Sequence, residues 1–195
     1  MTEQTSIQSP SQSKKRYVIN FIAGPSVGKS LVSALVYAEL KLLGHTTEYV
    51  QEYAKSLVWM KKWEKLNNQY LVTMKQYEMI KAVYDVPSIQ YTVVDSSLLL
   101  CLYYNRINEN NVSNVQKTDE MTLNKLQEFE NIFIVLDRHP DAKYEEAGRV
   151  QTHQEAIQVD KDLRVMLKDL KLPYKSFLSC KESVPDIIEY IRSYI

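Results

Sequence analysis

A segment near the N-terminus has the residue types and the spacing of a phosphate-binding loop. Its form is (A/G)xxxxGK(S/T), in which backbone N–H groups form a nest for an anion and the following helix adds the positive end of its dipole. We expect Lys29 to place its charge on the β and γ phosphates of a nucleotide, and the hydroxyl of Ser30 to ligate magnesium. The segment therefore predicts a P-loop for ATP and Mg²⁺, formed by Ala23, Gly24, Pro25, Ser26, Val27, Gly28, Lys29 and Ser30.

The flanking residues are those that a P-loop requires. Residues 15–23 form an apolar run rich in β-forming side chains, which predicts a strand. Residues 29–43 show apolar side chains at helical spacing, and Gly44 follows as a stop signal. Glycine is usual at the first position of the motif, and Ala23 suits that position if its φ angle is negative. A chance glycine-lysine-serine turn would not have this strand and helix around it.

A carboxylate follows the apolar run that we predict as a strand over residues 89–95. Asp95, at the end of this strand, has the arrangement of a Walker-B residue, which holds magnesium directly or through water. Asp95, Ser96 and Ser97 also suit the N-cap of the next helix. The two roles are compatible if different oxygens are used.

A second carboxylate, Glu52, follows the short strand predicted at residues 46–50. Ligands of open α/β sheets bind beyond the carboxyl ends of the strands. Glu52 is therefore a candidate to accept the proton of an attacking hydroxyl or to hydrogen-bond a sugar. The structural alternative is a glutamate in the first turn of a helix, where the helix dipole favours a negative charge.

The charged segment 137–151 lies between a predicted strand at 131–136 and a predicted long helix at 152–171. Small P-loop kinases have their lid at this place, and lid arginines neutralise charge on the transferred phosphoryl group. Arg138 and Arg149 are the candidates. The alternative is that either arginine is solvated or pairs with Glu145 or Glu146.

Residues 53–84 read as two helices broken near residues 67–68, and they are unusually aromatic. Such side chains can stack on a nucleobase, although aromatics at this density are more often part of a core. Gln69 and Gln76 share one helical face and are weak candidates to read a base edge. The aromatic residues are Trp59, Trp63, Tyr70, Tyr77 and Tyr84.

Length and composition suit one domain. The chain has 195 residues, of which 45% are hydrophobic, and its 24 basic side chains balance 24 acidic ones. Zero net charge gives no electrostatic reason for tight nucleic-acid binding, although a local basic groove is compatible with it. We expect a disordered lead-in at 1–14 and one α/β domain at 15–195, with strands and helices alternating around a parallel sheet. No apolar run is long enough to cross a bilayer, so we expect no membrane partner and a cytoplasmic location.

The order GPSVGKS, EYVQEYAK, VVDSS, EEAGRVQ and AIQVDKDL resembles a group of P-loop kinases over about residues 17–178. This group contains the ribosylnicotinamide kinase domain of bacterial NAD-regulator proteins and many phage-encoded relatives. The resemblance implies a three-layer sandwich with strand order 2-3-1-4-5 and a lid after strand four. It also implies that Lys29 and Ser30 bind ATP and magnesium, that Asp95 and Glu52 face the acceptor and metal, and that Arg149 serves the lid.

These observations together favour a kinase over a GTPase. No Asn-Lys-x-Asp tetrapeptide, which guanine-specific GTPases use, occurs in the chain. We expect transfer of the γ-phosphoryl group of ATP to a hydroxyl or phosphate of a small nucleoside-like or nucleotide-like acceptor, whose identity the sequence leaves open. The alternatives are an ATP-binding or ATP-hydrolysing regulatory module, and a kinase that acts on a modified base in DNA.

Overall fold

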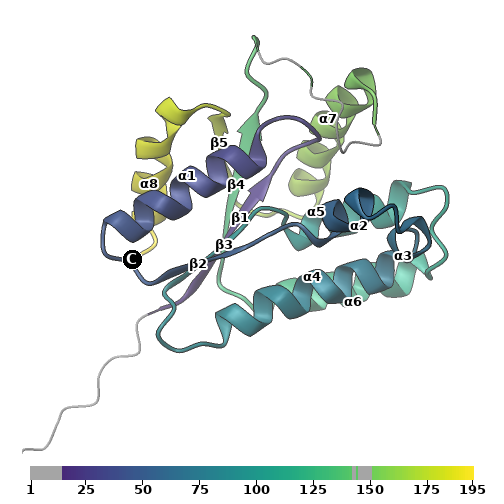
Figure 1. Cartoon of the computed structure of the whole chain (residues 1–195), viewed down its shortest axis with the longest axis horizontal. Helices are drawn as coiled ribbons and strands as arrows, with labels where there is room; N and C mark the ends of the chain where they lie inside the picture. The colour runs from purple at the N-terminus through teal and green to yellow at the C-terminus, as the bar shows by residue number, and fades with distance from the viewer. Residues whose placement is uncertain (1–14, 142–143, 145–150) are drawn as a thin grey trace, which may run out of the picture.

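The computed structural model describes residues 15–141, 144 and 151–195. Its centre is a five-stranded sheet in the order β2-β3-β1-β4-β5, and every neighbouring pair is parallel (Figure 1). The predicted α/β class and the implied strand order 2-3-1-4-5 are therefore confirmed. The strands are β1 (Tyr17–Ile22), β2 (Thr47–Val50), β3 (Tyr91–Val94), β4 (Asn131–Asp137) and β5 (Lys175–Leu178).

Helices cover both faces of the sheet (Figure 1), so the central strands β1 and β3 are buried on both sides. Alternate residues of β1 belong to different halves of the core: Ile19 and Phe21 pack with helices α1 (Lys29–Leu42) and α8 (Val184–Arg192). Val18 and Ile22 pack on the opposite side. The helices that contribute to that side are α4 (Gln69–Tyr84), α5 (Leu98–Ile107), α6 (Val115–Leu126) and α7 (His153–Asp169).

The segment after β2 differs from the prediction. It contains three helices, α2 (Tyr53–Trp59), α3 (Trp63–Leu66) and α4, rather than two. The expected break is present, since Asn68 caps α4 by accepting a hydrogen bond from the Leu71 N–H at 3.1 Å. The additional break lies at Lys61, which has a positive φ of 53° and therefore cannot continue a helix.

The start of α6 also differs from what the sequence indicates. The polar, asparagine-rich residues 108–116 predict a loop and residues 119–130 a helix, but α6 begins at Val115 and ends at Leu126. Asn114 sets this start, because its side chain accepts a hydrogen bond from the Lys117 N–H at 2.9 Å. Near the C-terminus, a 3₁₀ turn η1 (Lys181–Ser183) leads into α8.

Several expectations fall on residues outside the described part of the chain. They are the lead-in at 1–14, Glu145, Glu146 and the proposed lid residue Arg149. Within the described part, no helix has the length and apolar character needed to span a membrane. Both cysteines are free, with Cys101 buried and Cys180 half-buried.

Candidate functional site

The predicted P-loop joins β1 to α1 at the carboxyl edge of the sheet. Gly28 is the N-cap of α1 and has a φ of 108°, a conformation that only glycine adopts without strain. A Cβ atom at Gly28 would also lie 2.6 Å from the Oγ of Ser179, which follows β5. No side chain caps α1 and its first turn holds no acidic residue, so this helix start suits an external anion.

Alanine at the first P-loop position is compatible with the backbone. Ala23 is buried and is not among the described residues with positive φ, so its side chain causes no strain there. Lys29 is half-buried and forms no ion pair with any carboxylate of the described residues. Its charge is therefore not neutralised within the described part of the protein.

An unpredicted residue, Asp160 of α7, contacts the loop directly. The Gly24 N–H donates a hydrogen bond to Asp160 Oδ1 at 2.8 Å. A Cβ atom at Gly24 would lie only 2.4 Å from the same oxygen, so this close approach requires glycine. Asp160 lies within the segment AIQVDKDL. An aspartate in the middle of a helix is usually solvated, so its residue type did not indicate a contact with the P-loop.

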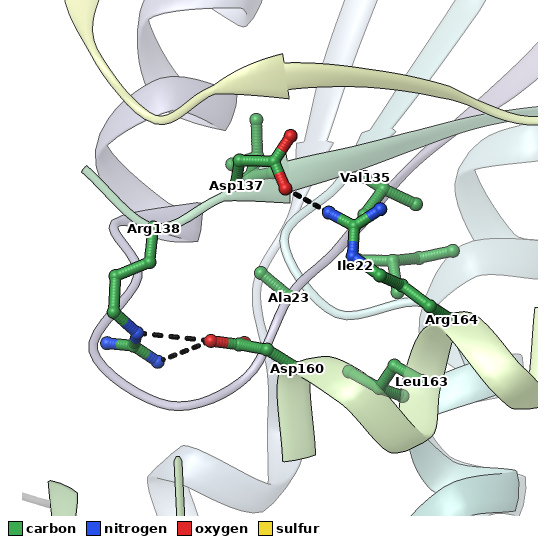
Figure 2. Close-up of a pocket in the computed structure, with 9 residues that line it drawn as sticks. Ile22, Ala23, Val135, Asp137, Arg138, Asp160, Leu163 and Arg164 are labelled. Atoms are coloured by element: carbon green, nitrogen blue, oxygen red, sulfur yellow. Dashed lines mark hydrogen bonds and ion pairs between the residues drawn. The ribbon is translucent and has the colours of Figure 1, made fainter. Parts of the chain in front are cut away.

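The structure places Arg138 against the P-loop rather than in open solvent (Figure 2). Its guanidinium donates to Asp160 Oδ2 from Nε at 3.1 Å and from Nη2 at 2.9 Å. Nη2 also donates to the Pro25 carbonyl at 2.9 Å. A solvated arginine does not describe these contacts, and the alternative partners Glu145 and Glu146 lie outside the described residues.

A small cavity lies between the ends of β1 and β4 and the helix α7 (Figure 2). Its volume is about 200 Å³, and Ala23 and Leu163 contribute apolar walls. Across the cavity from Arg138, Arg164 forms an ion pair with Asp137, the last residue of β4. Two ion pairs therefore connect the β4 end to α7, and one of them also reaches the P-loop.

Asp95 lies next to the start of α1, as the Walker-B prediction requires. The Ser30 Oγ donates a hydrogen bond to Asp95 Oδ2 at 2.7 Å, and Asp95 is only 4% exposed. Its other oxygen, Oδ1, is buried and has no hydrogen-bond partner among the described residues. The N-cap of α5 is Ser97, whose Oγ accepts from the Leu99 N–H at 3.2 Å, so Asp95 does not have that role.

This donor set fits magnesium held jointly by protein and nucleotide. Among the described residues, no three His, Cys, Asp or Glu side chains gather into a metal site formed by protein alone. Mg²⁺ is usually bound through one or two carboxylates plus the phosphates of a nucleotide. Ser30 and the unpartnered oxygen of Asp95 match that pattern, because a buried carboxylate oxygen without a partner is costly.

Glu52 and Asp95 lie at the ends of neighbouring strands. Val50 pairs with Val94 in the sheet, and the Asp95 N–H donates to the Val50 carbonyl at 3.0 Å. Glu52 is half-buried at the N-cap of α2, but its side chain makes no capping hydrogen bond. Burial raises the pKa of Tyr49 to about 12, and the negative charges of Asp95 and Glu52 add to this shift.

Gln76 holds the backbone on either side of Glu52. Its Oε1 accepts from the Tyr53 N–H at 2.8 Å, and its Nε2 donates to the Gln51 carbonyl at 3.2 Å. Gln69 Nε2 similarly donates to the Leu66 carbonyl at 2.8 Å. Both amides are buried and bonded to the backbone, which is a structural role instead of the predicted reading of a base edge.

The aromatic stretch divides between core and surface. Tyr77 is buried, where it packs against Phe129. In contrast, Trp59 and Trp63 are exposed, at 60% and 47% of each residue's surface. The expectation that aromatics at this density build the core therefore holds for Tyr77 and fails for the two tryptophans.

No family model matches the chain, and no curated protein matches it in sequence. Among solved structures, it is similar to the NadR protein in complex with NAD and AMP-PNP, with TM-score 0.61 and 13% identity over 91% of this chain and 49% of that one. It thus spans about half of the NadR chain. It is also similar to deoxyadenosine kinase from M. mycoides with the products dCMP and a flexible dCDP bound, with TM-score 0.54 and 18% identity over 91% and 97% of the two chains. At these identities the likeness shows the fold, so the chain has the P-loop NTPase fold with strand order 2-3-1-4-5, as the resemblance to P-loop kinases implies.

Proposed function

We propose that this protein is an ATP- and magnesium-dependent kinase that transfers the γ-phosphoryl group to a small nucleoside-like or nucleotide-like acceptor. The contact between Ser30 and Asp95 carries the proposal. It brings the hydroxyl of the P-loop and the carboxylate that follows β3 within 2.7 Å of each other, and Asp95 Oδ1 has no hydrogen-bond partner in the part of the chain that the structure describes. A metal ion bridging the protein and a nucleotide would satisfy that oxygen.

The donor half of the site is formed by the P-loop and the first turn of α1. Residues 26–30 would hold the phosphates through backbone N–H groups, since Pro25 has no N–H and that of Gly24 is bonded to Asp160. Lys29 would neutralise charge on the β and γ phosphates. Magnesium, held by Ser30 and Asp95, would supply charge neutralisation of the transferring phosphoryl group when bound. The lid role of Arg149 stays part of the proposal and concerns a residue outside the described ranges.

The acceptor half of the site is the end of β2. In the proposed step, an acceptor oxygen bonds to the γ-phosphorus, the bond from that phosphorus to the β–γ bridging oxygen breaks, and ADP leaves. The proton of an acceptor hydroxyl passes to a carboxylate. We assign this role to Glu52, because Asp95 already accepts a hydrogen bond from Ser30 and is more deeply buried.

The fold neighbours support the ligand class. One neighbour was solved with AMP-PNP and NAD, and the other is named a deoxyadenosine kinase and was solved with dCMP and dCDP. A donor nucleotide and an acceptor of nucleoside type are therefore the first ligands to test here. We expect the reaction to take place in the cytoplasm.

The test is transfer of label from γ-³²P-ATP with Mg²⁺ to a panel of ribo- and deoxyribonucleosides, their monophosphates and nicotinamide riboside. A general base contributes about 10²–10⁴-fold to rate, so Glu52→Gln should lower transfer by that range. Glu48→Gln is the matched control, since Glu48 lies in β2, is half-exposed and is paired with Lys41. Labelled inorganic phosphate without any labelled acceptor would instead favour the regulatory ATPase alternative.

A surface feature favours one alternative acceptor, a base within a single-stranded nucleic acid. The exposed Trp59 and Trp63 flank Lys61 and Lys62, and these lysines form no ion pair among the described residues. Exposed aromatics interleaved with lysines suit base stacking and phosphate contact. Salt-dependent binding of an oligonucleotide, weakened by Trp63→Ala, with label transfer to that oligonucleotide would favour this reading over a small acceptor.

A further inference from the structure

The Asp160 carboxylate makes two kinds of contact that no other described carboxylate combines. Oδ1 accepts from the Gly24 N–H of the P-loop, and Oδ2 accepts twice from the Arg138 guanidinium. Arg138 in turn donates to the Pro25 carbonyl. Gly24, Asp160, Arg138 and Pro25 thus form a closed circuit that ties the first half of the P-loop to α7 and to the segment after β4. Figure 2 shows the contact between Arg138 and Asp160.

The circuit is sheltered enough to restrict the loop. The side chains of Arg138 and Asp160 are 16% and 23% exposed, so solvent screens the pair less than it screens a surface salt bridge. Removing one partner would leave the other charge partly buried and unpaired. Gly24 has no room for a side chain between its backbone and α7, so the loop approaches the helix as closely as its backbone allows.

The circuit does not use the groups that the proposed reaction uses. None of its hydrogen bonds involves Lys29, the Ser30 hydroxyl or the loop N–H groups next to α1. Asp160 and Arg138 therefore act on the backbone of the loop at Gly24 and Pro25. A phosphate nest binds through the orientation of its backbone N–H groups, so a group that fixes this backbone sets its affinity for an anion.

We propose that Asp160, with Arg138, is a positioning residue that holds the P-loop in its phosphate-binding conformation. This inference rests on the proposed function for its ligand, ATP, and it gives Arg138 a role on the loop in place of the predicted role on the transferred phosphoryl group. The circuit raises affinity for the triphosphate through the loop backbone and leaves the acceptor carboxylate Glu52 unaffected.

The first test is equilibrium binding of a fluorescent ATP analogue with Mg²⁺ to the full chain, without acceptor. Asp160→Ala should raise its Kd about tenfold, which corresponds to about 1.4 kcal/mol and to the loss of roughly one charge-assisted hydrogen bond. Asp160→Asn keeps an acceptor for the Gly24 N–H but no charge for Arg138, so its Kd should rise about threefold. Arg138→Met should raise Kd about tenfold.

The matched controls come from the same helix. Asp162 accepts from Tyr103 at 3.0 Å and from Gln158 at 2.7 Å, away from the loop, so Asp162→Asn should leave the Kd within about twofold of wild type. Arg164→Met removes the ion pair with Asp137, the second one between α7 and β4. It tests whether losing a connection between these two elements, away from the loop, is enough to change the Kd for ATP. Thermal unfolding of every variant separates lost affinity from lost stability.

A double variant distinguishes positioning from direct contact. Arg138→Met combined with Asp160→Ala should bind ATP no more than about twofold more weakly than either single variant, because both remove the same circuit. A Kd raised about a hundredfold, the product of the two single effects, would show that Arg138 contacts the nucleotide independently and would overturn the proposal. Asp160→Ala with an unchanged Kd would overturn it as well.

A second readout requires no ligand. The chain has only four glycines, so ¹⁵N-glycine labelling gives a simple amide spectrum in which Gly24 is assigned by its loss in Gly24→Ala. Exchange of the Gly24 amide with solvent should accelerate about tenfold in Asp160→Ala and stay within about threefold in Asp160→Asn. If the Gly24 amide exchanges equally fast in wild type and Asp160→Ala, the positioning role alone is overturned. If the wild-type chain binds no ATP, the proposed function and the inference are overturned together.

Discussion

Replacing Gly24 by alanine tests the packing of the P-loop against α7. The new Cβ atom would lie 2.4 Å from Asp160 Oδ1 and 2.9 Å from the Ala156 carbonyl oxygen. The carboxylate can rotate away only by breaking its bond to the Gly24 N–H, and the carbonyl belongs to the helix backbone and cannot rotate. The loop and α7 must therefore separate.

The cost can be worked out from these contacts. A hydrogen bond to a charged group contributes about 1.5–3 kcal/mol, and overlap of the kind met at Ala156 costs about 1–3 kcal/mol, so we expect a loss of about 2.5–6 kcal/mol of unfolding free energy. For a chain of this length, about 2–4 °C of Tm per kcal/mol gives a decrease of about 5–24 °C. The Kd for ATP should rise at least tenfold, because the displaced loop no longer aligns its N–H groups.

The matched control is Gly44→Ala. Gly44 also has a φ that disfavours other residues, 85°, but a Cβ atom there would lie farther than 4 Å from every atom of the described residues. This variant should lose only about 1–2 kcal/mol of unfolding free energy, the amount that a left-handed backbone costs a non-glycine residue, and it should bind ATP like wild type. Differential scanning calorimetry and nucleotide titration of both variants decide the matter. If Gly24→Ala melts no lower than Gly44→Ala and binds ATP normally, the packing argument is wrong.

Three further outcomes follow from the structure. Ser30→Ala should weaken the Mg²⁺ dependence of ATP binding while leaving Tm within a few degrees, as a magnesium titration would reveal. Hydrogen bonds from the Thr152 backbone and side chain lower the pKa of Glu155 in the folded state. The stability that this capping box contributes is therefore present above the ordinary pKa of 4.5 and is lost as the pH falls through the lower pKa of the folded state. In Glu155→Gln, Tm should therefore fall less between neutral and acid pH than it does in wild type. Burial raises the pKa of the Cys101 thiol to about 12, so a thiol reagent at pH 8 should modify Cys180 and spare Cys101 until the protein unfolds.

The parts of the molecule that the sequence predicts well are those with strong local signals. The strand before Ala23, the helix after Gly28 and the stop at Gly44 each depend on periodicity or backbone conformation, which act over a few residues. Asp95 was placed at a strand end for the same reason. The strand order, by contrast, came from resemblance alone, because no local property of a strand specifies its neighbours.

The errors have physical causes too. Lysine is not a turn-forming residue, so the positive φ at Lys61 and the division of α2 from α3 gave no signal. The asparagine-rich run before α6 offers several caps, and the sequence does not show that Asn114 is the one used. The bond from Asp160 to Gly24 joins residues 136 positions apart, and such a tertiary contact leaves no trace in residue type.

The proposed kinase activity requires that the γ-phosphoryl group of ATP reaches an organic acceptor. ³¹P NMR of the full chain with ATP, Mg²⁺ and a mixture of nucleosides and nucleotides follows that phosphorus through the reaction. We predict a new phosphoester or phosphoanhydride resonance that grows as ATP is converted to ADP, and its loss in Lys29→Ala and Asp95→Asn. Growth of inorganic phosphate alone, or ATP bound but unchanged with every acceptor, would contradict the proposed kinase activity.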